Sequence, residues 1–192
     1  MELQEIQNID GGRLLEYKTP IVGLRWFQTL IRRDTRGSFS EFRIPEVMGG
    51  LNIRQSNLSV SELGVIRGMH GENQDKFVTV AQGRAIGAWV DARKNSETFG
   101  IVTRLNLEQG WGVFIPEGVL NGFAVTEGPL IYAYMVSKTY NELDPEKQIA
   151  VNPLSSFPDF PNGLFPEIRH PLVSERDSRY AITWNDFRAD LR

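Results

Sequence analysis

The sequence has no cysteine and only two histidines, His70 and His170. Without cysteine there is no disulfide framework, thiolate metal site or cysteine nucleophile, and cysteine usage gives no information about the redox compartment. A mononuclear iron, manganese or zinc site needs several imidazoles and a carboxylate around one ion, and this chain has no His-x-His pair. We therefore expect no metal site.

A basic surface and a long apolar run are also missing. The 192 residues carry a formal net charge of −3, so the concentrated positive charge of a nucleic-acid-binding protein is not expected. No apolar stretch reaches the length of a membrane span, and the N-terminus lacks the basic start and apolar run of a signal peptide. These absences predict a cytoplasmic protein with neither nucleic acid nor membrane as a partner.

Eighteen glycines and 10 prolines accompany short β-branched or aromatic runs. These runs recur about every ten residues, which predicts a sandwich or barrel of antiparallel strands. The clearest predicted strands are Val65–Met69, Lys76–Ala81, Arg84–Asp91, Gly100–Leu107, Gly112–Ile115, Gly122–Thr126 and Leu130–Ser137. The length fits one domain over residues 1–192.

Turn signals separate the predicted strands. Gln82-Gly83 predicts a hairpin because glycine accepts a positive φ without a Cβ clash. Glu108-Gln109-Gly110 and Glu127-Gly128-Pro129 extend this pattern to a meander of hairpins. Six prolines then interrupt residues 141–171, which predicts a loop-rich wrap over residues 141–180.

His70 ends the segment Gly64–His70, which also carries Arg67. Strict alternation along a strand would place the two side chains on opposite faces, so joint action requires a bend at Gly68 or Gly71. Taken alone, a histidine near a strand end is more typical of a solvated or hydrogen-bonded side chain than of a functional one. We expect His170, which lies in the proline-rich segment, to be on the surface.

Motifs over about residues 20–180 resemble the dTDP-4-dehydrorhamnose 3,5-epimerase family. Asp34–Glu41 resembles D-x-R-G-x-F-x-E, and Gln55–Ser59 with Gly64–His70 resembles Q-x-N-x-S followed by G-V-L-R-G-L-H. The order continues with segments similar to further motifs of the family, namely Asp75–Val78, Val90–Arg93, Ser96–Gly100, Ile115–Gly118, Gly122-Phe123, Tyr132–Tyr134, Tyr140 and Ser174–Asp177.

The resemblance implies an all-β cupin jelly roll with short C-terminal helical or loop segments and no cofactor. It implies a homodimer with N-terminal strands, about residues 1–60, at the interface. The implied activity is inversion of C3, C5 or both in a nucleotide-linked 4-keto-6-deoxyhexose, during deoxysugar or polysaccharide biosynthesis. The implied substrate is a dTDP-sugar, with a CDP- or GDP-linked sugar, or a non-catalytic sugar-nucleotide-binding relative, as alternatives.

The resemblance also implies catalytic roles. A ketone at C4 acidifies the hydrogens on C3 and C5, so the reaction needs a base, an acid across the ring and stabilisation of the oxyanion. His70 is the implied base, Asp177 the carboxylate that orients it, and Tyr134 the acid. Tyr132 shares a strand face with Tyr134, and either tyrosine is also compatible with a core position. Without the resemblance, Asp177 would fit an exposed turn.

The remaining expected contacts bind the substrate. Cationic side chains suit a diphosphate, although surface ion pairs are the alternative for them, and Phe39 also suits a core position. The family's position before Gly-Phe is histidine, whereas this chain has Asn121, and the connection from His70 to Lys76 is shorter than in the rhamnose-pathway enzymes. The expected substrate-binding residues are Arg36, Phe39, Glu41, Gln55, Asn57, Arg67, Lys76, Asn121, Tyr140 and Arg176.

Overall fold

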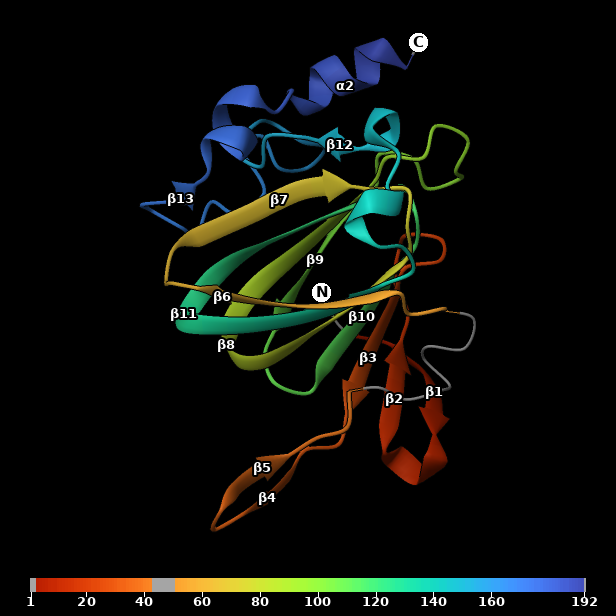
Figure 1. The fold of residues 1–192 in the computed structure, drawn as a ribbon, viewed down its shortest axis with the longest axis vertical. Coiled ribbons are helices and arrows are strands. Elements are labelled where there is room, and N and C mark those ends of the chain that lie inside the picture. The colour runs from red at the N-terminus through yellow and green to blue at the C-terminus, as the bar shows by residue number, and fades with distance from the viewer. Residues whose placement is uncertain (1–2, 43–50, 192) are drawn as a thin grey trace.

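The computed structural model describes residues 3–42 and 51–191 and places eleven described strands in one largely antiparallel sheet. The sheet folds over on itself into the two layers of a jelly roll (Figure 1). The predicted fold class is confirmed. The strands of this sheet are β1 (Glu5–Ile9), β2 (Leu14–Tyr17), β3 (Arg25–Thr29), β6 (Gln55–Ser61), β7 (Val65–Gly71), β8 (Lys76–Asp91), β9 (Val102–Leu107), β10 (Trp111–Ile115), β11 (Val119–Val136), β12 (Ile149–Ala150) and β13 (Leu172–Val173).

The predicted meander of hairpins is wrong. Gln82-Gly83 lies inside β8 and Glu127-Gly128-Pro129 lies inside β11, and these two long strands pair with each other from Val119↔Asp91 to Val136↔Lys76. The chain therefore bends at both places instead of reversing. Gly83 has φ +80°, and a Cβ there would lie 2.6 Å from the Glu127 carbonyl oxygen, so the crossing of the two bends requires glycine.

The turn at residues 108–110 also differs from the predicted hairpin. β9 pairs with the second half of β8, whereas β10 pairs with the first half of β8 and with β3. The turn thus carries the chain from one layer to the other. Local turn chemistry could not distinguish this crossing from a hairpin, because the pairing partner lies elsewhere in the sequence.

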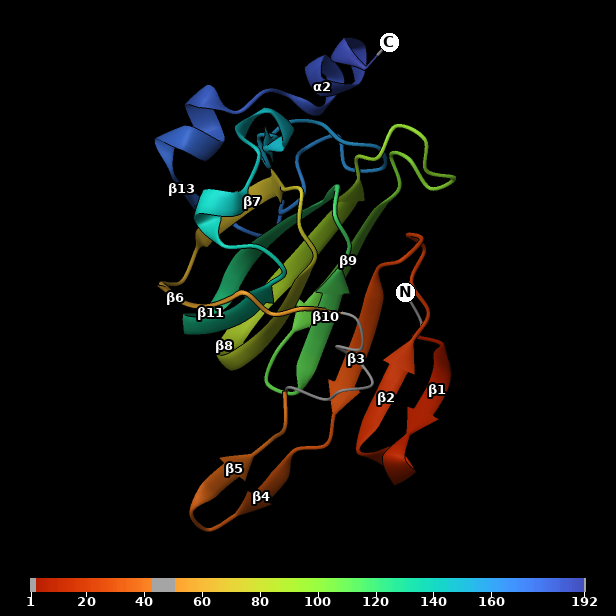
Figure 2. The ribbon, with the colours of Figure 1, turned by 45° about the vertical axis from the view of Figure 1, so that its right-hand side comes forward.

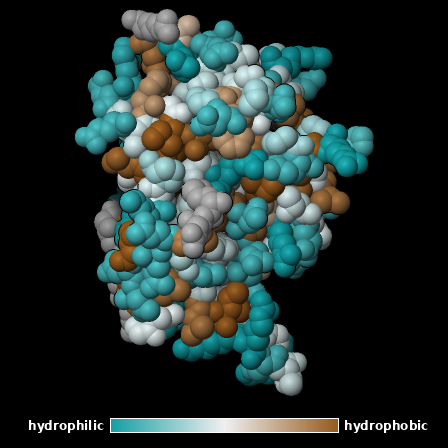
Figure 3. Space-filling model, turned by 180° about the vertical axis from the view of Figure 1, so that it is seen from behind, coloured by the Kyte–Doolittle hydropathy of each residue, from teal (hydrophilic) through white to brown (hydrophobic). Residues whose placement is uncertain are grey.

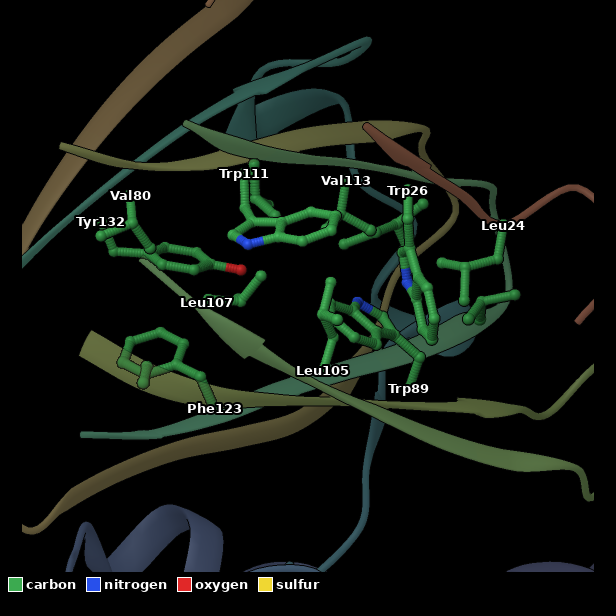
Figure 4. Packing of buried hydrophobic residues seen from close by; sticks show 14 of the residues in the cluster. Leu24, Trp26, Val80, Trp89, Leu105, Leu107, Trp111, Val113, Phe123 and Tyr132 are labelled. Carbon is green, nitrogen blue, oxygen red and sulfur yellow. The ribbon is translucent and has the colours of Figure 1, made fainter. Parts of the chain in front are cut away.

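Aromatic side chains fill the space between the layers (Figure 4). The rings of Trp26 and Trp89 lie 5.9 Å apart, and those of Phe123 and Tyr132 stack at 4.4 Å. Burial of such large side chains is the main favourable contribution to the stability of the barrel. This packed interior gives the strand ends around it fixed positions.

A second apolar cluster attaches the C-terminal part of the chain to the outside of the sheet. Helix α2 (Trp184–Asp190) buries Trp184 and Phe187, and Trp184 stacks on Phe157 at 5.8 Å. Before α2, residues 140–180 form loops with 3₁₀ turns at Tyr140–Glu142 and Pro145–Lys147 and a π-helical turn at Arg176–Tyr180. The wrap lies across β7 (Figure 1), where β12 and β13 pair with that strand. No helix among residues 3–42 and 51–191 is both long and apolar enough to cross a membrane.

A separate hairpin of β4 (Arg32–Asp34) and β5 (Gly37–Phe39) projects away from the barrel (Figures 1 and 2). All six residues of its strands are exposed. Seen from behind, the projection is mostly hydrophilic (Figure 3).

The fully buried carboxylate of Asp91 ties two loops to the barrel. It receives hydrogen bonds from the Arg93 guanidinium group at 2.8 Å and from the Ser96 and Thr98 hydroxyls at 2.6 Å. Arg93 also donates to the Val22 carbonyl oxygen. Burial alone would raise the pKa of Asp91, but these donors outweigh it and lower the pKa from 3.8 to about 2.

We expect Asp91→Asn to lower the free energy of unfolding by about 2 kcal/mol at neutral pH, since a pKa unit corresponds to about 1.4 kcal/mol. Because the pKa is depressed in the folded state, the stabilisation is complete above about pH 4 and is lost as the pH falls towards about 2. Urea unfolding across that range should give a flatter pH profile for the variant. Asp159→Asn, at an exposed position, is the control, and equal stability of Asp91→Asn and wild type at neutral pH would contradict the expectation.

Candidate active site

Strand β7 presents Arg67 and His70 to the same cavity. Arg67 pairs with Phe123 and His70 with Asn121, so two residues of β7 lie between these pairs where β11 has only one. This extra residue in β7 forms a β-bulge. The bend that the sequence requires therefore falls at Gly68, which has φ +113°. A Cβ at Gly68 would lie 2.6 Å from the Asn121 carbonyl oxygen, so the bulge requires glycine.

The C-terminal wrap brings Asp177 to His70. Asp177 Oδ1 lies 2.6 Å from His70 Nε2, and its Oδ2 lies 3.4 Å from the amide nitrogen of Gly68. Burial alone would raise the pKa of the Asp177 carboxyl, but the hydrogen bond and charge of His70 outweigh burial, so the pKa is lowered. An ionised carboxylate only accepts hydrogen bonds, so Nε2 carries the proton of this contact, and Nδ1 is the nitrogen that is unprotonated whenever the ring is neutral.

His70 and Asp177 line a cavity of about 620 Å³ bounded by β7, β11 and the C-terminal wrap. A volume of this size is typical of small-molecule sites. Other predicted site residues that line the cavity are Arg67, Lys76, Asn121, Tyr134, Tyr140 and Arg176.

Tyr134 is half-buried in the cavity wall, and Tyr132 lies deeper. Burial and the charge of Glu72 raise the pKa of Tyr134, while Arg67 opposes them. Tyr132 is only 2% exposed, its ring stacks on Phe123, and burial raises the pKa of its phenol. Tyr134 thus offers a neutral phenol to the cavity, whereas Tyr132 belongs to the packed interior.

Gln55 and Asn57, on the edge strand β6, lie beside the cavity and outside its lining. Gln55 Nε2 donates to Asn57 Oδ1 at 2.6 Å, and its Oε1 accepts from the backbone amide of Tyr140 at 3.1 Å. Asn57 is the cross-strand neighbour of Tyr134. These amides therefore hold the rim of the cavity around two of its tyrosines.

The structure does not bring Arg36, Phe39 and Glu41 to this cavity. Arg36 pairs with Asp34 in the projecting hairpin, and Phe39 is 60% exposed. Glu41 accepts hydrogen bonds from Arg13 at 2.8 and 3.1 Å. Within one chain, these three expected substrate contacts are thus separate from His70, the implied catalytic base.

Glu72 also lines the cavity, although no motif in the sequence pointed to it. Its carboxylate Oε2 lies 3.0 Å from Lys76 Nζ and accepts from Gln74 Nε2 at 2.6 Å. Alternation from His70 would have placed Glu72 on the same side, which is the signal the sequence offered. Among the described residues, no three histidine, aspartate or glutamate side chains are grouped as metal ligands would be.

The cavity contains a histidine that an ionised carboxylate holds in place, and it also contains a neutral phenol. These two groups can move protons to and from a carbon acid. Together with the rolled sheet, this site defines the class of the protein as a cupin jelly roll with acid–base residues in its barrel.

Comparison with known proteins identifies the family. The model for dTDP-4-dehydrorhamnose 3,5-epimerase matches residues 18–185, so the chain belongs to that family. The chain is 39% identical over 127 residues to "Protein RmlC homolog" of Streptococcus pyogenes, covering 61% of this chain and 64% of that relative, slightly under two thirds of its length. The dTDP-4-dehydrorhamnose 3-epimerase of Streptomyces niveus is 35% identical over 159 residues, which cover 76% of this chain and 72% of that relative.

A solved structure agrees with this family. The 4-keto-6-deoxy sugar epimerase NovW of Streptomyces spheroides superimposes with a TM-score of 0.78 and 29% identity, over 92% of this chain and 90% of that one. The family predicted from the sequence motifs is thereby confirmed.

Proposed function

We propose that the protein is an epimerase that inverts C3, C5 or both of a nucleotide-linked 4-keto-6-deoxyhexose in deoxysugar or polysaccharide biosynthesis. The observation that carries this proposal is the presence of the His70–Asp177 pair and Tyr134 in one cavity. Membership of the family supports it, and dTDP in the family's description makes a dTDP-sugar the first substrate to test.

The proposed chemistry is a two-step proton transfer. His70 Nδ1 takes the proton from the carbon beside the ketone, and the C–H electron pair moves onto the carbonyl oxygen as an enolate. Asp177 stabilises the imidazolium that results. Tyr134 then gives its proton to the opposite face of that carbon, which inverts it, and exchange with solvent returns the proton from His70 to Tyr134. The net reaction neither gains nor loses a proton.

Positive charge near the cavity suits the rest of the substrate. We propose that Arg67, Lys76 and Arg176, which all line the cavity, bind the diphosphate or the sugar oxygens. Arg67 Nε donates to Ser61 Oγ at 3.0 Å, which orients the guanidinium group and leaves its other N–H groups for a ligand. Asn121 also lines the cavity, and we propose that its amide binds a sugar hydroxyl.

A homodimer would reunite the separated contacts. We propose that the β4–β5 hairpin of one protomer reaches the cavity of its partner and places Arg36 and Phe39 beside the nucleotide, with Glu41 close to them. The exposure of this hairpin and its projection beyond the barrel support this arrangement (Figure 2). The proposed interface includes the N-terminal strands of about residues 1–60.

Deuterium uptake tests the proposed reaction. The protein is incubated in heavy water with dTDP-4-keto-6-deoxyglucose, and label at C3 and C5 is read by NMR. Label at both carbons is the result for a double epimerase, and label at one carbon indicates a single-centre enzyme. No exchange from this substrate or its CDP and GDP analogues would overturn the enzymatic proposal and favour a sugar-nucleotide-binding protein.

The melting temperature in the presence of different nucleotides shows which nucleobase the substrate carries. A ligand that binds only the folded state raises the melting temperature. We expect the largest rise with dTDP, and a larger rise with CDP or GDP would reassign the substrate.

A further inference from the structure

Glu72 places a carboxylate inside a cavity that is proposed to receive an anionic diphosphate. Its side chain is 24% exposed, and its partner Lys76 is 14% exposed. A partly buried carboxylate costs free energy unless it is paired, and its charge opposes the binding of a substrate with the same sign. The ion pair with Lys76 offsets the cost of burial, but the repulsion of an anionic substrate is difficult to explain unless the carboxylate serves another group in the cavity.

The contacts of Glu72 lead to Tyr134. Lys76 Nζ lies 3.0 Å from Glu72 Oε2 and 5.4 Å from the centre of the Tyr134 ring, within the range of a cation–π contact. Lys76 opens β8, and its second neighbour along that strand, Val78, pairs with Tyr134 in β11. Lys76 and Tyr134 are therefore diagonal neighbours on one face of the sheet. The Glu72 carboxylate contacts the ammonium group of Lys76.

The charges around Tyr134 are mixed in sign. Arg67 and Lys76 are positive, and a positive charge favours the phenolate, which cannot donate a proton. The same two cations are proposed to bind the substrate, so the site needs their positive charge. Burial and, after it, the charge of the Glu72 carboxylate, which contacts Lys76, raise the pKa of Tyr134 against this positive charge. The titratable groups that line the cavity with Tyr134 come from β7, the β7–β8 connection, β8, β11 and the wrap: Arg67, His70, Glu72, Lys76, Tyr132, Tyr140, Arg176 and Asp177.

We propose that Glu72 is a positioning residue for Tyr134: its carboxylate fixes the Lys76 ammonium group beside the phenol ring and offsets the positive charge there, so that the phenol remains in its proton-donating form. This role rests on the proposed function of Tyr134 as the acid. With Glu72 present, the same cavity can hold cations that bind the substrate and a tyrosine that remains protonated.

Glu72→Gln tests the proposal because it removes the charge and keeps an oxygen that can accept from Lys76. Tyrosinate absorbance is titrated in wild type and in Glu72→Gln, and each curve is corrected by the same background carrying Tyr134→Phe, since the chain has five tyrosines. We expect the midpoint of Tyr134 to fall by about one pH unit in Glu72→Gln. The alkaline limb of kcat should shift in the same direction, with KM changed less than about threefold.

Two further variants make the result specific. Glu72→Asp keeps the charge, so the titration midpoint of Tyr134 should lie close to that of wild type, even if the shorter side chain lowers kcat. Glu117→Gln removes an exposed carboxylate outside the cavity lining and should leave the midpoint unchanged.

Failure of this proposal can be told from failure of the proposed function. An active wild type whose Tyr134 midpoint is unmoved by Glu72→Gln, or equally moved by Glu117→Gln, would overturn the role of Glu72 alone. A wild type inactive on every sugar nucleotide tested would overturn the proposed function and this role with it.

Discussion

His70→Ala is expected to slow deuterium exchange at the carbons beside the ketone by about 10²–10⁴-fold. General-base catalysis by a positioned histidine contributes about 10²–10⁴-fold to a rate, and no other side chain of the cavity combines a free imidazole nitrogen with an ionised partner. Because Asp177 is left without its partner, Asp177→Asn in the same background should cause little further loss. Single-turnover NMR in heavy water measures both effects.

The chain offers a matched control for this experiment. His170 is its only other histidine, is exposed, and does not line the cavity. His170→Ala should exchange and epimerise like wild type. Exchange that persists at the wild-type rate in His70→Ala would remove His70 from the chemistry and leave the proposed mechanism without a base.

Tyr134→Phe is expected to separate exchange from inversion. With His70 intact, the enolate still forms, but the proton can return only from the face on which the base lies. Deuterium should therefore enter with retention of configuration, while the rate of inversion falls by about 10²-fold or more. Coupling constants in the NMR spectrum distinguish the retained from the inverted centre in the same sample.

Tyr180→Phe is the control for Tyr134→Phe, since Tyr180 is 73% exposed and lies outside the cavity lining. Inversion at the wild-type rate in Tyr134→Phe would show that the acid is another group or a water molecule. Loss of exchange and inversion in equal measure would instead indicate that Tyr134 acts before the enolate forms, by binding the ketone.

The wrong hairpin predictions have one physical cause. The residues at Gln82-Gly83 and Glu127-Gly128-Pro129 are typical of tight turns, and the chain does change direction there. Whether it reverses or bends depends on the strand it pairs with, and β8 and β11 pair with each other along both of their halves. Pairing over such sequence distances is not encoded in a local pattern.

In the site, too, local features were predicted from the sequence, whereas contacts between distant residues were not. The segment Gly64–His70 predicted a bend that unites Arg67 with His70, and a glycine-dependent bulge at Gly68 provides it. The motif around Arg36 and Phe39 was equally recognisable, yet in the single chain it lies on a hairpin away from the cavity. Glu72 matched no motif, and its importance became visible only from its distances to Lys76 and Gln74.

The sequence by itself determined the family, the all-β class, the approximate positions of the central strands and the residue types available for acid–base chemistry. These follow from local composition, alternation and motif order, which need no knowledge of distant contacts. The resemblance implied that Asp177 orients His70, but only the tertiary structure placed the two side chains 2.6 Å apart across 107 residues of sequence. It alone also placed the Glu72 carboxylate 3.0 Å from Lys76, whose ammonium group lies 5.4 Å from the centre of the Tyr134 ring. Those contacts depend on how the wrap, anchored by Trp184, packs against β7 and on how two bent strands pair, and both are decided by packing over long sequence distances.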